Sequence, residues 1–318
     1  MQKKYINSLH VGANIRDSRI RERAFGGSAR QHDSMEFFLW LCNIIADETN
    51  PGRNQPEYNL DNEFDIQAYN ADPSIRRATS KFRTRKLFNA ASDLQARTDV
   101  MQMTVTICAN KGCGAMRRNW QNNIVKELVV TEEPPVQDLG VALARDTGPG
   151  SEETLDSYGC ETCGTLGKDG TAKVVFGNKG DVLARAWRYQ VWLPDYLWIN
   201  VNRYTNKLEK IETTYTFPEK GVDLSSTFAP PDDPTPDYPL PRQQQGPFLY
   251  DVYAVIQHGG RTIAGGHYWT LARSPDKNGA AGTWHRFNDS SVTPASFKDT
   301  QTSNTSGIFL VRQGAPLL

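Results

Sequence analysis

The 318-residue chain has no excess of charge of either sign and no long apolar run. Lysine plus arginine and aspartate plus glutamate both number 36, so the formal net charge is zero, which argues against a protein that binds nucleic acid through a basic face. No apolar stretch approaches the roughly 20 residues that a membrane-spanning helix needs. Residues 1–20 also lack the apolar core of a secretory signal. We therefore expect a soluble protein of the cytoplasm or the nucleus, with no nucleic acid and no membrane among its partners.

Cysteine is scarce as well, with five residues in the whole chain, so the placement of each is informative. Four of them form two close pairs, Cys108 with Cys113 and Cys160 with Cys163, and Cys42 stands alone. Each pair is typical of a short knuckle at a strand end that presents two thiolates to one ion. Because zinc takes four such ligands tetrahedrally, the pattern predicts one closed, structural zinc site in a reducing compartment. The alternative is four unrelated buried thiols.

The hydrophobic pattern changes along the chain from helical to strand-like spacing. In "QHDSMEFFLWLCNIIADE", which starts at Gln31, apolar residues recur at helical intervals, and "SKFRTRKLFNAASDLQ" is a second candidate helix. From Met101 onward, alternating runs such as "MTVTIC" and "RAWRYQVWLPDYLWINVNRY" indicate strands. Residues 132–158 and 229–246 are rich in proline and are predicted to be long loops. Helices first and mostly antiparallel strands later indicate the α+β class.

One of the five histidines, His267, begins a candidate hairpin, "GGHYWTLARSPDKNGAAGTWHRFND". If residues 274–282 form its turn, the flanking strands place His267 opposite Asn288 and Asp289. Such a pair is two thirds of a nucleophilic triad, in which the third residue fixes the imidazole and the histidine deprotonates a thiol. A hairpin with a hydrogen-bonded structural histidine is the alternative.

Several segments stand in a fixed order along the chain. "QHDSMEFF" comes first, then the two cysteine pairs, then "LPDYLWINVNRY" with "FP" and "VDLS", and last "YDVYAVIQHGG" with "GGHYWTLAR" and "WHRFNDSSVT". Together they resemble the motifs of the ubiquitin-specific protease family of cysteine deubiquitinases, from about Gln31 to the C-terminus. The resemblance implies one papain-like catalytic domain over residues 1–318, with an N-terminally incomplete helical thumb (about 1–100), zinc-bearing fingers (101–190) and an antiparallel-β palm with the His box (191–318).

The same resemblance implies a reaction and catalytic roles. The family reaction is thiol hydrolysis of the isopeptide bond after the C-terminal glycine of ubiquitin. By position, His267 would be the general base, Asn288 would orient it, and Asp289 would be an adjacent helper.

The resemblance further implies a cofactor and a partner. The two cysteine pairs would hold a structural Zn²⁺ ion in the fingers, and the partner would be ubiquitin or a ubiquitinated protein. The tail of ubiquitin would be bound by Asp33 of "QHDSMEFF" and by three residues of "GGHYWTLAR", namely Gly265, Gly266 and Tyr268. The two glycines leave room for a chain to approach closely. Asp33 could also serve as a cap at the start of its helix.

The nucleophilic cysteine of the family is absent from the expected place, an N-terminal box at a helix start well before "QHDSMEFF". No cysteine precedes Cys42, and the nearest similar segment, "KYINS", has Lys4 where the cysteine belongs. Cys42 lies in the middle of its predicted helix and is interpreted as a small buried apolar residue, because reactive thiolates favour helix N-termini or cationic, partly exposed sites.

The chain as it stands is therefore expected to be inactive. We interpret it as an N-terminally incomplete copy of an active enzyme. One alternative is a pseudo-deubiquitinase that binds ubiquitin or acts as a scaffold, and another is a zinc-stabilised interaction module unrelated to ubiquitin.

Overall fold

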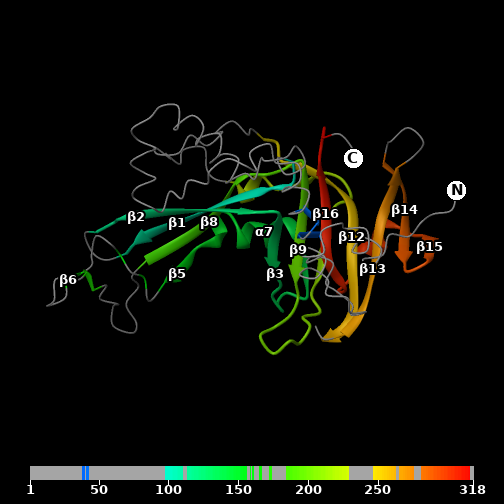
Figure 1. The fold of residues 1–318 in the computed structure, drawn as a ribbon, viewed down its shortest axis with the longest axis horizontal. Coiled ribbons are helices and arrows are strands. Elements are labelled where there is room, and N and C mark those ends of the chain that lie inside the picture. The colour runs from blue at the N-terminus through cyan, green and yellow to red at the C-terminus, as the bar shows by residue number, and fades with distance from the viewer. Residues whose placement is uncertain are drawn as a thin grey trace, which may run out of the picture.

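The computed structural model describes residues 38–39, 41–42, 97–109, 113–155, 158, 160, 165–166, 172–173, 184–228, 246–262, 265–275 and 281–315. Within them, two β-sheets dominate, and the smaller one extends from the side of the larger one (Figure 1). The second candidate helix and residues 229–245 lie outside the described residues. Phe38, Leu39, Leu41 and Cys42 are helical, as the spacing of apolar residues predicted.

The smaller sheet has the strand order β2-β1-β8-β5. Its strands are β1 (Val100–Cys108), β2 (Met116–Asn123), β5 (Glu153–Leu155) and β8 (Ala184–Trp192), and every pairing is antiparallel. On β1, Met101, Met103 and Val105 are buried, which matches the alternation of the sequence. A separate two-stranded sheet pairs β6 (Thr165–Leu166) with β7 (Ala172–Lys173).

The larger sheet has the order β15-β14-β13-β12-β16-β9-β3. Its strands are β3 (Val125–Val129), β9 (Tyr196–Asn202), β12 (Leu249–Thr262), β13 (Gly265–Pro275), β14 (Ala281–Asn288), β15 (Ser291–Pro294) and β16 (Thr305–Arg312). Among the described strands of this sheet, only β3 and β9 pair in parallel. β11 (Val222–Asp223) pairs with β12, and β4 (Val136–Asp138) forms a separate, parallel two-stranded sheet with β10 (Thr214–Thr216). Short 3-10 turns cover Pro149–Ser151, Ser225–Thr227 and Phe297–Thr300.

Both faces of the larger sheet are covered at β9, which explains the unbroken apolar run of that strand. Leu197 and Ile199 join the main core on one face. Trp198 points to the other face and packs with Phe38 and Cys42 of the N-terminal helical residues. The larger sheet therefore stands between the main core and the helical segment that contains Cys42.

The prediction that residues 132–158 form a long loop was wrong, because they include helix α7 (Leu139–Asp146). Asp138 caps this helix by accepting a hydrogen bond from the backbone of Val141 at 3.0 Å. Leu139, Ala142 and Leu143 are fully buried in the main core. These three apolar positions are the helical signal within an otherwise loop-like segment. No helix among the described residues is long and apolar enough to span a membrane.

Helix α7 and strand β3 belong structurally to the larger sheet. Lys126 of β3 makes a largely buried ion pair with Asp146 at the end of α7. Burial lowers the pKa of Lys126, and the neighbouring Asp146 carboxylate opposes that shift. We therefore propose that residues 124–151 are part of the palm, although the sequence-based division placed them in the fingers.

Candidate active site and thiol cluster

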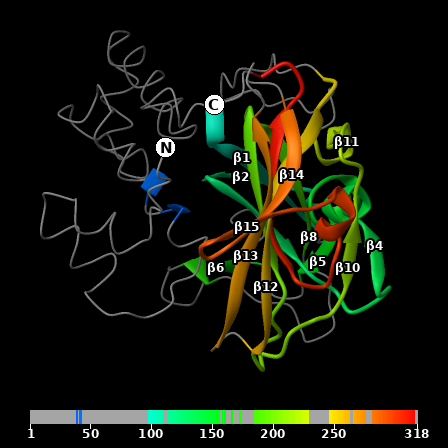
Figure 2. The same cartoon turned by 90° about the vertical axis from the view of Figure 1, so that its right-hand side faces the viewer.

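His267 is the third residue of β13, which pairs with β12 in an antiparallel ladder. Figure 2 shows these two strands side by side. The register of β13 with β14 pairs Thr270 with Phe287, so Asn288 lies one step beyond this pair along β14. His267 is then the diagonal neighbour of Asn288 on the same face, rather than the directly opposed residue that the turn arithmetic predicted. A register irregularity between Arg273 and Pro275 accounts for part of this difference.

The imidazole of His267 lies in hydrogen-bonding contact with Asn288. Its Nε2 atom is 2.5 Å from Oδ1 of Asn288. Because an amide oxygen only accepts, Nε2 carries the proton in this contact, and Nδ1 keeps its lone pair. Nδ1 is therefore the nitrogen that could take a proton from a thiol. The predicted neighbourhood of these two residues is confirmed, whereas a catalytic role for them remains a prediction.

Asp289 lies farther from the imidazole. Its Oδ2 atom is 3.8 Å from Nε2 of His267, and its side chain is 79% exposed. At that exposure a carboxylate contributes little to holding a partner. Asp289 has a φ of 49°, a left-handed conformation in the tight turn between β14 and β15 that aspartate tolerates better than most residues. The geometry thus ranks Asn288 first and Asp289 second as the orienting group.

The four residues predicted to contact the tail of ubiquitin differ in their surroundings. Asp33 lies outside the described residues. At Gly265 a Cβ atom would meet no heavy atom within 4 Å, so this position is open. At Gly266 a Cβ atom would stand 2.2 Å from Nε2 of His258, so internal packing already requires glycine there. Tyr268 is partly buried, and its ring centroid is 4.3 Å from that of His258.

Cys42 has the surroundings of a structural residue. It is 3% exposed and packs with Trp198 and Ile256. Burial, with a smaller contribution from the charge of Asp99, raises the pKa of the Cys42 thiol to about 12. A thiol with such a pKa stays protonated near neutral pH, and only the thiolate is a strong nucleophile. The interpretation of Cys42 as a buried apolar residue is confirmed.

Three of the four predicted metal ligands come together at the end of the smaller sheet. The sulfur atoms of Cys108, Cys113 and Cys160 all lie within 4.8 Å of one another. The Cys113 and Cys160 sulfurs are 3.7 Å apart, close to the separation of about 3.8 Å that a tetrahedron with Zn–S bonds of about 2.3 Å requires. Cys163 lies outside the described residues. The donor set and spacing therefore fit a zinc ion, and sequence reasoning found these three residues correctly as a cluster.

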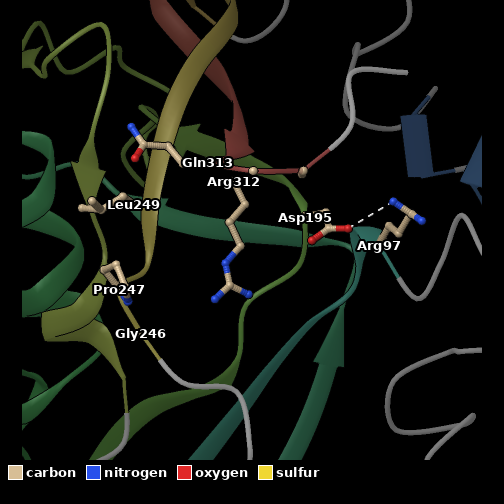
Figure 3. A pocket seen from close by; sticks show the side chains of 9 residues that line it. Arg97, Asp195, Gly246, Pro247, Leu249, Arg312 and Gln313 are labelled. Carbon is tan, nitrogen blue, oxygen red and sulfur yellow. Dashed lines mark hydrogen bonds and ion pairs between the residues drawn. The ribbon is translucent and has the colours of Figure 1, made fainter.

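A cavity of about 570 Å³ lies at the end of the larger sheet that is opposite His267. Figure 3 shows Arg312 extending into it, while Arg97 is paired with Asp195 at 3.3 Å. The cavity is lined in part by Leu249, the first residue of β12, whereas the His267 hairpin follows Thr262, its last residue. At about 3.3 Å per residue these ends are roughly 40 Å apart, so the cavity is separate from the histidine site.

Comparison with known proteins gives a family and a fold. The family model described as ubiquitin carboxyl-terminal hydrolase matches residues 15–311. Ubiquitin carboxyl-terminal hydrolase 2 of Homo sapiens is 34% identical over 119 residues, which are 36% of this chain and 17% of that protein. Ubiquitin carboxyl-terminal hydrolase 12 of Saccharomyces cerevisiae is 32% identical over 128 residues, which are 39% of this chain and 9% of that protein.

Among solved structures, the chain is similar to the SAGA Ubp8/Sgf11/Sus1/Sgf73 DUB module bound to ubiquitin aldehyde. The TM-score is 0.55 at 14% sequence identity, over 90% of this chain and 50% of that chain. This likeness confirms the expected α+β, papain-like fold and by itself shows the fold alone. The chain spans less than a fifth of the length of the two curated relatives named above. Because the family model covers nearly all of the sequence, the chain belongs to the ubiquitin carboxyl-terminal hydrolase family.

Proposed function

We propose that the chain is a deubiquitinase-type domain that binds ubiquitin or ubiquitinated proteins and receives the tail of ubiquitin beside His267. The observation that carries the proposal is the contact of the His267 imidazole with the Asn288 amide oxygen at 2.5 Å. This contact keeps Nδ1 as a base, which is the arrangement that thiol chemistry needs. Family membership supports the partner and argues against an interaction module unrelated to ubiquitin.

In the reaction of the family, a thiolate attacks the carbonyl carbon of the last ubiquitin glycine. The C–N bond to the lysine then breaks, and the protonated His267 would donate its proton to the leaving amine. Water would next attack the thioester, with His267 as the base, and release ubiquitin and the thiol. Asn288 would keep the imidazole in one tautomer through both steps, as the third residue of a triad does.

The sequence supplies no thiol for this reaction before Cys42. Cys42 is itself unsuited to the task, because burial holds it as the neutral thiol. We therefore propose that the 318-residue chain binds ubiquitin without cleaving its conjugates. Such binding is expected both of a pseudo-deubiquitinase and of an active enzyme that lacks its cysteine box.

We also propose that Cys108, Cys113 and Cys160, with Cys163 as the fourth ligand, hold a structural Zn²⁺ ion. Four thiolates would fill its coordination shell and leave no open position for substrate, so its contribution would be to fold the tip of the fingers. Thiolate ligation also suits the cytoplasm or the nucleus, where cysteines stay reduced. Asp33 and Tyr268 keep their proposed places along the tail channel.

The test is a binding titration of the purified chain with ubiquitin, next to ubiquitin trimmed at its C-terminal tail. We expect saturable binding of intact ubiquitin and weaker binding of the trimmed form. Ubiquitin carrying a thiol-reactive group at its C-terminus should give no covalent adduct. Absence of ubiquitin binding would reject the proposed function, and an adduct that disappears in Cys42→Ser would reject the structural role of Cys42.

A further inference from the structure

His258 on β12 is held from three sides. Its backbone N–H donates to the carbonyl of Asn304 at 2.7 Å, and its own carbonyl accepts from Nζ of Lys210 at 3.1 Å. Its ring Nδ1 lies 2.7 Å from the hydroxyl oxygen of Tyr204. The residue is only 5% exposed. A buried polar ring with a hydroxyl partner and a fixed backbone has little freedom to move.

The ring of His258 packs against the strand that contains His267. His258 pairs with Tyr268 across the β12–β13 ladder, and the two ring centroids are 4.3 Å apart. On the other side of His267, the ring lies so close to Gly266 that a Cβ atom there would be 2.2 Å from its Nε2. His258 therefore touches both chain neighbours of His267.

Side chains alternate between the two faces of a strand. Gly266 and Tyr268 consequently share one face of β13, where His258 lies, and His267 points to the opposite face. That opposite face is where Nε2 of His267 reaches Asn288. A shift of the strand by one residue would exchange the faces and break this contact. The packing of His258 opposes such a shift.

We propose that His258 is a positioning residue, which, held by Tyr204, fixes Gly266 and Tyr268 and thereby fixes the imidazole of His267 against Asn288. The proposal rests on the proposed function only for the role given to His267. An apolar residue of similar size at position 258 would still pack against Gly266 and Tyr268, but it would lose the hydrogen bond to Tyr204. His258 and Tyr204 are therefore proposed to act together. His258 acts on His267 only through these neighbours and is not proposed to contact the substrate.

The experiment uses the full chain with ¹⁵N-labelled histidine and reads the tautomer of His267 by NMR. In the wild type we expect one tautomer, with the proton on Nε2 and two well-separated ring ¹⁵N resonances. In His258→Ala these resonances should move toward each other, because the imidazole exchanges between tautomers once Asn288 no longer holds it. Tyr204→Phe, which removes only the hydroxyl, should shift them part of the way. His258→Gln, whose amide can still bond Tyr204, should restore most of the separation.

A matched control separates positioning from general loss of stability. Leu128→Ala truncates a fully buried residue on β3, and we expect it to lower the melting temperature without changing the His267 tautomer. An unchanged tautomer in folded His258→Ala, or an equal change in Leu128→Ala, would overturn the proposal. If His258→Ala does not fold, an unchanged tautomer in Tyr204→Phe overturns it. No measurement here involves ubiquitin, so a failure of ubiquitin binding would reject the proposed function and leave this inference intact.

Discussion

The His267 hairpin and the thiol cluster both join residues that are distant in sequence, but they do so by different means. His267 and Asn288 are 21 residues apart and stand on strands of one hydrogen-bonded sheet. Cys113 and Cys160 are 47 residues apart and lie outside the strands. The fold therefore organises the first site before any ligand arrives. The second site collects thiols that would repel one another as thiolates, so on the proposed zinc site a bound cation would hold them together.

The largest expected effect comes from removing the metal. We expect about one zinc ion per wild-type chain and none in Cys160→Ser, because three thiolates at a structural site bind far more weakly than four. Structural zinc contributes on the order of 10 kcal/mol to small zinc domains, so a chelator should unfold the fingers. Metal analysis and proteolysis of the segment around residues 108–163 would measure both effects.

The His267 tautomer after zinc removal tests whether the His267 hairpin and the thiol cluster are organised independently. If the two sites are organised independently, the chelated chain keeps the His267 tautomer, read by the same NMR experiment. Loss of that tautomer together with the zinc would show that the hairpin depends on the fingers. A folded wild-type chain that contains no metal would contradict the zinc site itself.

The next effect comes from the two glycines before His267, which form a matched pair. Gly266→Ala places a methyl group against the His258 ring and against the carbonyl oxygen of Gly259, 2.6 Å away. Overpacking of this kind costs about 1–3 kcal/mol. Gly265→Ala meets no atom within 4 Å and should leave the free energy of unfolding nearly unchanged.

Chemical denaturation of both glycine variants measures this contrast. Equal stability of Gly265→Ala and Gly266→Ala would mean that the hairpin yields to the added methyl group, and that the sheet does not fix His267. If Gly265→Ala instead weakens ubiquitin binding at unchanged stability, the open position is used by the ligand, as the sequence predicted for both glycines.

The sequence predicted those features that a short local pattern determines. It did not predict the features that depend on packing between distant residues. The spacing of Cys108 and Cys113 and of the second pair identified the thiol cluster, because turn geometry brings such residues together. The hairpin around His267 was found for the same reason. Its predicted register was wrong, in part because of the irregularity between Arg273 and Pro275. Helix α7 was missed because three buried residues in a proline- and glycine-rich segment form too short a pattern.

The role of His258 could not be predicted from the sequence. Its partners, Tyr204 and Asn304, are far from it in the chain and meet it only when β9, β12 and β16 lie side by side. Gly266 also appeared to be an open position, because a glycine that faces a substrate and a glycine that faces a buried ring look the same in a sequence. Only tertiary packing distinguishes the two cases.

A smaller effect distinguishes the two candidate orienting residues. Asn288→Ala removes the direct partner of His267 Nε2 and should cost about 1 kcal/mol in the free energy of unfolding. It should also release the His267 tautomer. Asp289→Ala removes an exposed carboxylate at 3.8 Å, and the expected change is below about 0.5 kcal/mol. Thermal melting and the NMR readout of His267 compare the two variants, and a larger tautomer change in Asp289→Ala would reverse the ranking.

The smallest effect concerns Cys42, on the face of the larger sheet away from the main core. Its pKa in the folded chain is raised to about 12, whereas an ordinary cysteine has a pKa of about 8.5. The folded state thus favours the neutral thiol, so this contribution to stability is fully present below about pH 8.5 and is lost as the pH rises toward 12. From pH 8.5 to 9.5 the loss should reach about 1 kcal/mol. Cys42→Ala lacks the titrating group, so the difference in melting temperature between the wild type and this variant should shift with pH in that window. A difference that stays constant from pH 7.5 to 9.5 would mean that the thiol is solvated in the folded chain, which would reopen Cys42 as a reactive residue.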